Sequence, residues 1–239
     1  MSTATTLQLA TADGPMDVYE ATPAGTATAA VIVAQEAFGV NEHIQDVTRR
    51  FADAGYLAVA PALFHRSGGG TAPYDDFSKI APLMQAMTDD GILTDVDATI
   101  AHLHERGVAD EAIGCVGFCM GGRVAFLVAA NRALGASVTF YGGGIVGGGR
   151  AMFPPLVDRA ATLQTPWLGL FGDLDQGIPV EGVEELRTSV AAAPVDTEIV
   201  RYAEAGHGFH CDEREAYHAA SAEDGWRRTL DWLSAHLSS

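Results

Sequence analysis

Residues 117–122, with the sequence GFCMGG, contain the side chain best suited to covalent chemistry. The segment has the G-x-S-x-G form of a nucleophile elbow, with Cys119 in the place of the serine. In such an elbow a strand turns sharply into a helix, and small residues two positions before and after the nucleophile let the backbones pass. The helix start favours a thiolate and offers N–H groups to an oxyanion. The alternative is a buried structural cysteine, a role for which Cys115 is the better candidate.

A nucleophile of this kind needs a base and an orienting acid, which follow it in the chain in the order acid, then histidine. His207 stands between two glycines just after an apolar run, and it could exchange a proton with Cys119. The alternative for His207 is a solvated loop histidine. Asp173 and Asp175 both follow the apolar run 167–171, and spacing alone does not choose between them as the acid.

Glu36 follows another apolar run and would point into the same cleft as the elbow. Near Cys119 its carboxylate could repel a thiolate or accept the thiol proton, and so keep the nucleophile latent until substrate arrives. The alternative for Glu36 is a helix-capping or solvated glutamate.

The elements that must position these side chains alternate along the chain. Apolar runs predict strands at 29–34, 56–61, 113–118, 136–141, 167–171 and 197–202, with an edge hairpin at 7–9 and 16–19. Helical patterns lie at 89–103, 123–131, 180–190 and 225–237. Strand–helix alternation predicts an α/β fold with a mostly parallel sheet and helices on both faces. Because no linker or repeat interrupts it, we expect one domain over residues 1–239.

Composition excludes several classes of protein. Of the 239 residues, 48% are hydrophobic and 19% charged, which excludes disorder for most of the chain. A net charge of −17 without a basic cluster argues against binding to nucleic acid. We also find no apolar run long enough for a membrane span and no signal peptide at residues 1–11, and three cysteines do not form a disulfide framework. We therefore expect a cytoplasmic monomer or homodimer.

Two further patterns suggest cofactors but have simpler explanations. Residues 142–147 fit G-x-G-x-x-G, yet the glycines and prolines that follow discourage the helix that a dinucleotide site needs, so we expect a flexible loop over the cleft. His207, His210, Cys211 and Asp212 could bind zinc, but the elbow explains His207 without a metal. We expect neither a metal nor an organic cofactor. Met84 and Met87 are predicted to lie in the core or to line a pocket.

The chain resembles the dienelactone hydrolase family of α/β-hydrolases. The matching stretches, in family order, are residues 35–39 (QEAFG), 55–61, 117–122, 172–179 and 204–209. A cysteine elbow combined with Gln-Glu-x-Phe-Gly is specific, since related esterases usually carry serine.

The resemblance implies an α/β-hydrolase fold and roles for individual residues. Cys119, Asp175 and His207 would form the catalytic triad, the amides of Met120 and Ala37 would form the oxyanion hole, and Glu36 would lie beside the cysteine. Phe38, Tyr141 and His210 would line the substrate site.

One departure from the family concerns the recognition of an anion. The best-known members hold the substrate carboxylate with arginines, one of them shortly after the catalytic histidine. Here no arginine follows His207 until Arg214, and the second expected place falls near Lys79. Lys79, Arg66 or His210 could substitute, so the resemblance predicts acyl-hydrolase chemistry more directly than it predicts a dienelactone substrate.

The predicted function is hydrolysis of a small ester or lactone through a thioester on Cys119. Two alternatives remain: an acyltransferase or thioesterase with the same triad, and a redox-sensing protein that uses Cys119 as a sensor thiol.

Overall fold

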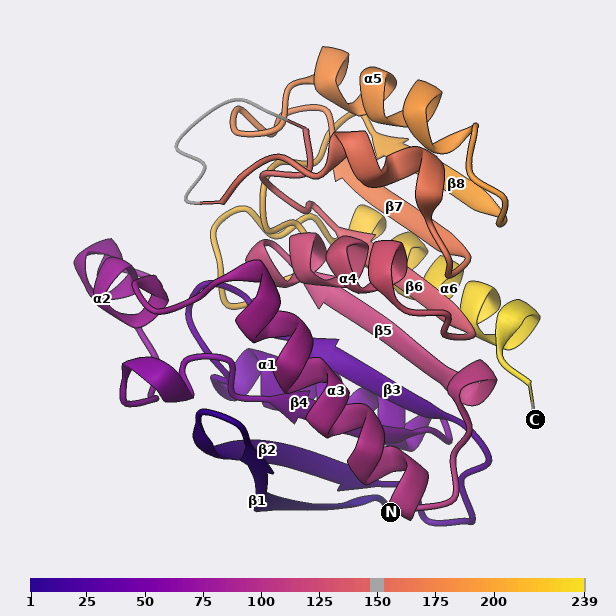
Figure 1. Cartoon of the computed structure of the whole chain (residues 1–239). Helices are drawn as coiled ribbons and strands as arrows, with labels where there is room; N and C mark the ends of the chain where they lie inside the picture. The colour runs from indigo at the N-terminus through magenta and orange to yellow at the C-terminus, as the bar shows by residue number, and fades with distance from the viewer. Residues whose placement is uncertain (147–152, 239) are drawn as a thin grey trace.

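The computed structural model describes residues 1–146 and 153–238, and Figure 1 shows one twisted sheet between two layers of helices. The sheet has eight strands in the order β1-β2-β4-β3-β5-β6-β7-β8. β1 and β2 form an antiparallel hairpin, β2 pairs antiparallel with β4, and every other neighbouring pair is parallel. The strands are β1 (Thr3–Thr11), β2 (Gly14–Thr22), β3 (Ala30–Ala34), β4 (Leu57–Pro61), β5 (Ile113–Phe118), β6 (Ala136–Phe140), β7 (Trp167–Gly172) and β8 (Thr197–Tyr202).

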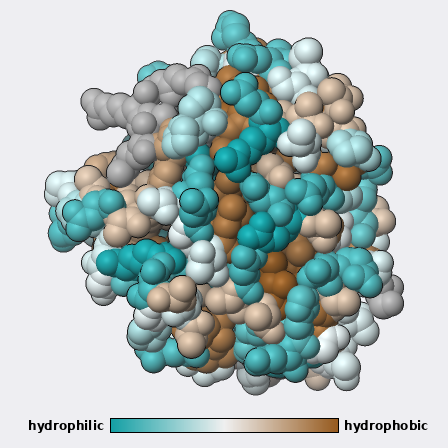
Figure 2. All heavy atoms as spheres, viewed as in Figure 1, coloured by the Kyte–Doolittle hydropathy of each residue, from teal (hydrophilic) through white to brown (hydrophobic). Residues whose placement is uncertain are grey.

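Helices cover both faces of this sheet. They are α1 (Glu42–Asp53), α2 (Ile80–Met84), α3 (Asp89–Glu105), α4 (Met120–Asn131), α5 (Val180–Val190) and α6 (Ala219–His236). In Figure 1, α3, α4 and α5 lie in front of the sheet and α1 and α6 behind it, while α2 stands away from the sheet. Each layer encloses its own apolar core cluster. On the face viewed in Figure 2, mainly hydrophilic side chains cover the hydrophobic atoms that show between them.

The predicted α/β-hydrolase fold is confirmed, with differences at the ends of elements. The hairpin β1–β2 is longer than predicted, α4 begins at Met120 instead of Arg123, and α6 begins at Ala219. The sequence analysis missed α1, although Asn41 caps its start by accepting a hydrogen bond from the Ile44 N–H. The central strands β3 to β7 are buried along their whole length, as expected of strands covered on both faces.

The connection from β5 to α4 is very tight. Cys119 lies between the two elements with φ 55° and ψ −116°, a backbone conformation that L-residues rarely adopt. A Cβ atom on Gly117 would lie 1.8 Å from the carbonyl oxygen of Gly121, and one on Gly121 would lie 2.1 Å from the carbonyl oxygen of Ala34 in β3. Glycine is therefore required on both sides of the cysteine, as the elbow motif predicts.

The glycine-rich stretch that follows β6 falls partly outside the described structure. The loop predicted to lie over the cleft includes residues 147–152, which lie outside the described residues. Within the described part of the chain, the helices are all too short or too polar to cross a bilayer.

The elbow contact gives a stability prediction. Replacing Gly121 with alanine forces a methyl group against the backbone of β3, so we expect Gly121→Ala to lower the free energy of unfolding by about 3 kcal/mol or more. Gly25→Ala is the matched control, because a Cβ there meets no atom within 4 Å. Urea denaturation measures both variants. Equal midpoints would show that the β5–α4 connection relaxes without cost.

Candidate active site

Three loops at the carboxyl ends of parallel strands bring Cys119, His207 and Asp175 together. Cys119 follows β5, Asp175 follows β7 and His207 follows β8. The Nε2 atom of His207 lies 3.0 Å from the Cys119 Sγ atom, and its Nδ1 atom lies 2.7 Å from Asp175 Oδ2. One imidazole thus joins the thiol to a carboxylate, which is the arrangement of a nucleophile, a base and an orienting acid.

The structure distinguishes the two aspartates that spacing could not separate. Asp173 faces the other way and forms two hydrogen bonds with the Arg201 guanidinium, at 2.7 and 2.8 Å. Asp175 is only 4% exposed, and its second oxygen accepts a hydrogen bond from the Gly177 N–H at 2.8 Å. The side chain of Asp175 is therefore held on the His207 ring.

The environment of His207 favours the imidazolium form. Burial alone lowers the pKa of this histidine, but the charge of Cys119 and the hydrogen bond with Asp175 outweigh it and raise the pKa to about 10. At neutral pH the raised pKa favours a protonated imidazole, and its Nε2 atom faces the Cys119 sulfur.

The two residues predicted to supply the oxyanion hole follow the neighbouring parallel strands β5 and β3. Met120 is the first residue of α4, where the N–H group has no partner within the helix. Ala37 lies in a short turn closed by the Gly39 N–H, which donates to the Glu36 carbonyl at 3.2 Å. Among the described residues, neither the Met120 nor the Ala37 N–H donates a backbone hydrogen bond outside the regular elements, so both are available to a substrate oxygen.

The Glu36 carboxylate is fully buried beside this centre. Its Oε2 atom accepts a hydrogen bond from the Tyr74 hydroxyl at 3.0 Å, and Oε1 lies 3.5 Å from Nη1 of Arg214. In this arrangement Glu36 engages Tyr74 and Arg214 while Cys119 engages His207. Modulation of the nucleophile by Glu36 stays a prediction.

Arg214 is the residue that the sequence analysis did not assign to the site. Successive turns after His207 fold the chain back, so that the guanidinium lies 5.6 Å from the ring centroids of both Phe38 and Tyr74. Gly208 has a φ of 85°, and a Cβ there would lie 2.4 Å from Arg214 Nη1. Glycine directly after the histidine was the available signal, because Gly208 makes room for an arginine six positions further on.

The other candidates for binding an anion are excluded by their surroundings. His210 is 2% exposed and its ring packs against Phe118 and Phe140, so burial lowers its pKa well below the ordinary value and leaves it neutral. The prediction that His210 binds substrate is therefore corrected. Lys79 points to solvent and pairs with Asp76, and Arg66 is held by the buried carboxylate of Asp95.

Phe38 and Tyr141 are buried aromatic residues that pack against side chains of the site. Phe38 is 2% exposed, and its ring centroid lies 4.5 Å from that of Tyr74. Tyr141 is fully buried, with its ring 5.2 Å from His207 and its hydroxyl without a partner among the described residues. Their direct contact with a substrate stays a prediction.

A groove of about 610 Å³ lies on the outer side of Tyr74 and Arg214. The groove is lined by Tyr74, Asp75, Phe77, Glu213, Arg214, Glu215 and Ala216. Tyr74 and Arg214 therefore separate the groove from the buried Glu36 carboxylate.

The three cysteines differ in their surroundings. Burial raises the pKa of the Cys115 thiol, inside β5, to about 12, and that of Cys211 to about 11. Cys211 contacts the Tyr74 hydroxyl at 3.3 Å, and only Cys119 is partly exposed. Within the described residues, no three His, Cys, Asp or Glu side chains are grouped so that they could hold a metal ion.

The raised pKa of His207 gives a prediction for titration. Because the charge of Cys119 is a main cause of the shift, Cys119→Ala should bring the imidazole pKa down from about 10 towards its usual range. NMR of labelled histidine measures this directly. Because the pKa of His207 is higher in the folded protein, protonation of this histidine stabilises the fold. This stabilisation is complete below the unfolded pKa of about 6.5 and is lost as the pH rises through about 10. An unchanged pKa in the variant would contradict the ion pair.

Comparison with known proteins shows the family of this chain. The family model of the dienelactone hydrolase family matches residues 16–237. A curated protein of Yersinia pestis with the name "Putative carboxymethylenebutenolidase" is 44% identical over 86% of this chain and 78% of its own length. The carboxymethylenebutenolidase of Pseudomonas putida is 30% identical over 89% of this chain and 88% of its own.

A solved structure has the same fold along almost the whole chain. It is a crystal structure from Klebsiella pneumoniae titled "Putative Dienelactone Hydrolase", with a TM-score of 0.89 and 37% identity over 98% of this chain and 99% of its own. With the family model and the curated relatives, this similarity shows that the chain belongs to the dienelactone hydrolase family of α/β-hydrolases.

Proposed function

We propose that the protein is a cysteine hydrolase that cleaves a small carboxylic ester or lactone through a thioester on Cys119. The observation that carries this proposal is the continuous contact from the Cys119 sulfur through the His207 ring to Asp175. Family membership supports hydrolase chemistry, and the cysteine in the elbow supplies its nucleophile.

The first half of the reaction forms the thioester. The Cys119 thiolate attacks the carbonyl carbon, and the carbonyl electrons move to the oxygen, which the Met120 and Ala37 amides stabilise. Removal of one such donor typically costs about 10²–10³ in kcat. As the carbon–oxygen bond breaks, the His207 imidazolium gives its Nε2 proton to the departing alkoxide.

The second half regenerates the enzyme. Neutral His207 takes a proton from water as the water oxygen attacks the thioester carbon, and the sulfur leaves as thiolate with the imidazolium beside it. Asp175 holds the ring orientation in both halves. For a lactone, the alcohol and the acid remain in one molecule and leave together.

The structure also supports an anionic substrate, like the one that the name of the Pseudomonas putida relative denotes. Arg214 lines the groove, and the side of its guanidinium that faces inward lies 3.5 Å from the Glu36 carboxylate without a hydrogen bond to it. We propose that a substrate carboxylate binds this guanidinium. The three free thiols also fit a reducing compartment, so we propose a cytoplasmic protein that acts as a monomer or homodimer.

An acyltransferase or thioesterase would use the same residues. An acyltransferase differs in the group that accepts the acyl chain, and the ratio of hydrolysis to transfer in the presence of an added alcohol or thiol identifies it. A thioesterase differs in the leaving group, which is a thiol, and the ratio of kcat/KM for a thioester to that for the matching oxygen ester identifies it. A redox sensor would instead show oxidation of Cys119 by peroxide without ester turnover.

The triad assignment is tested by three variants. Cys119→Ala should abolish hydrolysis of a neutral aryl acetate, and Asp175→Asn should lower kcat by roughly 10³–10⁴-fold because the imidazole loses its orienting partner. Asp173→Asn is the matched control, since Asp173 pairs with Arg201, and its kcat should stay within about threefold of wild type. Hydrolysis of the aryl acetate by Cys119→Ala at the wild-type rate would exclude the mechanism.

Substrate charge is tested at Arg214. Arg214→Gln should lower kcat/KM for a dienelactone by about 10²-fold, as expected when a charged hydrogen-bonding partner worth about 1.5–3 kcal/mol is lost. Lys79→Gln, which removes an exposed cation, should leave the value unchanged. Comparison with a neutral aryl ester separates anion recognition from general damage. Equal losses for both substrates would exclude carboxylate binding by Arg214.

A further inference from the structure

A small apolar cluster lies on one side of the proposed oxyanion hole, and we name it the methionine cluster. Its buried members are Phe64, Met84 and Met120, and Ala37, Ile80, Leu83, Met87 and Phe153 pack against them. The buried members belong to neither of the two clusters that flank the sheet. The methionine cluster includes Met120 and Ala37, so the side chains of both proposed oxyanion residues are part of it.

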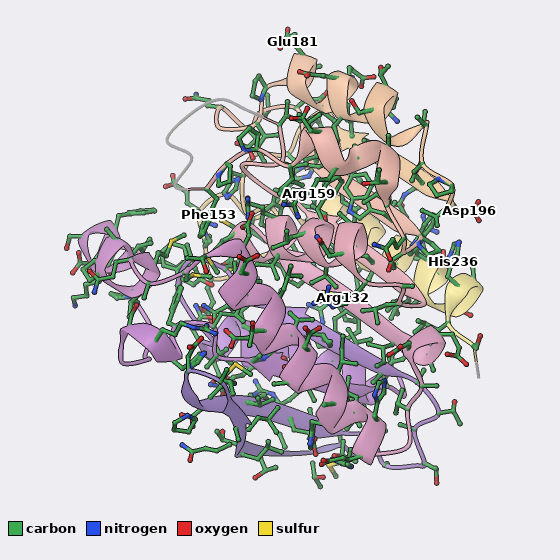
Figure 3. All side chains as sticks on the ribbon, in the orientation of Figure 1. Arg132, Phe153, Arg159, Glu181, Asp196 and His236 are labelled. Atoms are coloured by element: carbon green, nitrogen blue, oxygen red, sulfur yellow. The ribbon has the colours of Figure 1, made fainter. Side chains whose placement is uncertain are left out.

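The outer wall of the methionine cluster is the short helix α2. Ile80, Leu83 and Met84 follow the i, i+3, i+4 spacing of one helical face, yet Met84 is the only α2 residue that is buried. In Figure 3, Phe153 lies on the side of the molecule where α2 faces the start of α4. Arg123 of α4 fixes this segment, because its guanidinium donates to the Pro154 carbonyl at 2.7 Å and lies 4.7 Å from the Phe153 ring. An apolar, partly covered surface is thus held beside the reacting centre.

The chemistry of the methionine cluster selects against charged groups. Its members are apolar, and the cation that contacts them, Arg123, is already paired with the Asp89 carboxylate and the Pro154 carbonyl. A carboxylate that entered the cluster would lose its hydration without gaining a partner. Three of the eight members are methionines, whose unbranched thioether chains adapt to ligands of different shape.

The position of the methionine cluster relative to His207 indicates which part of the substrate it receives. The leaving group must depart next to His207, which protonates it, and His207 packs on Tyr141 and Asp175. No member of the methionine cluster comes from the loops that carry Asp175 and His207. On the basis of the proposed cysteine-hydrolase function, we propose that the methionine cluster is an acyl-side subsite that binds an apolar alkyl or aryl acyl chain.

The test keeps the leaving group constant and varies the acyl chain. The substrates are p-nitrophenyl acetate, butyrate and hexanoate. If each added methylene is removed from water in the cluster, kcat/KM of the wild type should rise by up to about fourfold per methylene, and by about tenfold from acetate to butyrate. A flat series, or a preference for acetate, would overturn the proposal.

Variants locate the preference. Leu83→Gln and Met84→Gln keep the length of the side chain but make it polar, and each should lower the hexanoate-to-acetate ratio of kcat/KM at least fivefold. Met84→Leu should retain the ratio. Leu93→Gln is the matched control, because Leu93 is a half-buried leucine of α3 outside the methionine cluster, and its ratio should stay within twofold of wild type.

The outcomes separate this proposal from the proposed function. Acetate hydrolysis that depends on Cys119, combined with ratios in Leu83→Gln and Met84→Gln equal to that of Leu93→Gln, overturns the subsite alone. Acetate hydrolysis that persists in Cys119→Ala overturns the proposed function. If circular dichroism shows that a glutamine variant does not fold, Leu83→Ala and Met87→Ala replace it. The same decrease in the hexanoate-to-acetate ratio of kcat/KM is expected for them.

Discussion

The active centre depends on a close contact between three backbone segments, β3, β5 and the start of α4. Gly121 packs directly on the Ala34 carbonyl, and Gly117 packs on the Gly121 carbonyl. This contact forces Cys119 into a backbone conformation with φ 55°, which projects its side chain from the edge of the sheet. The same contact joins the start of α4 to the end of β3. The proposed nucleophile and the proposed oxyanion donors are therefore positioned by the core of the fold itself.

Electrostatics then divides the site into distinct regions. Cys119 and Asp175 both contact the His207 ring and raise the pKa of the imidazole, while Asp175 is held by the Gly177 N–H. Glu36, equally buried, is held away from that pair by Tyr74 and Arg214. The chain has a net charge of −17, which disfavours anions overall. The inward-facing Arg214 gives this part of the site a local preference for an anion. The methionine cluster, which includes the proposed oxyanion residues Met120 and Ala37, is made of apolar side chains.

The sequence predicted features that depend on local rules. The apolar runs predicted the parallel strands, and the elbow predicted a strand-to-helix turn at Cys119, because both patterns follow from steric limits on a few adjacent residues. Asp175 was assigned through family resemblance, and only the position of Arg201 explains why Asp173 is unavailable. His210 was assigned wrongly, and Arg214 was missed, because the folding of the chain after His207 depends on long-range packing. Tyr74 was missed for the same reason, since it reaches Glu36 from 38 residues away.

The different burial of the three thiols has a practical consequence for measurements on this protein. Cys115 and Cys211 are shielded and hold their protons, whereas Cys119 is partly exposed and paired with an imidazolium. A thiol-directed reagent used in excess for a short time on the folded protein should therefore label one position per chain. The stoichiometry of such labelling counts competent active centres in a preparation, without any knowledge of the natural substrate.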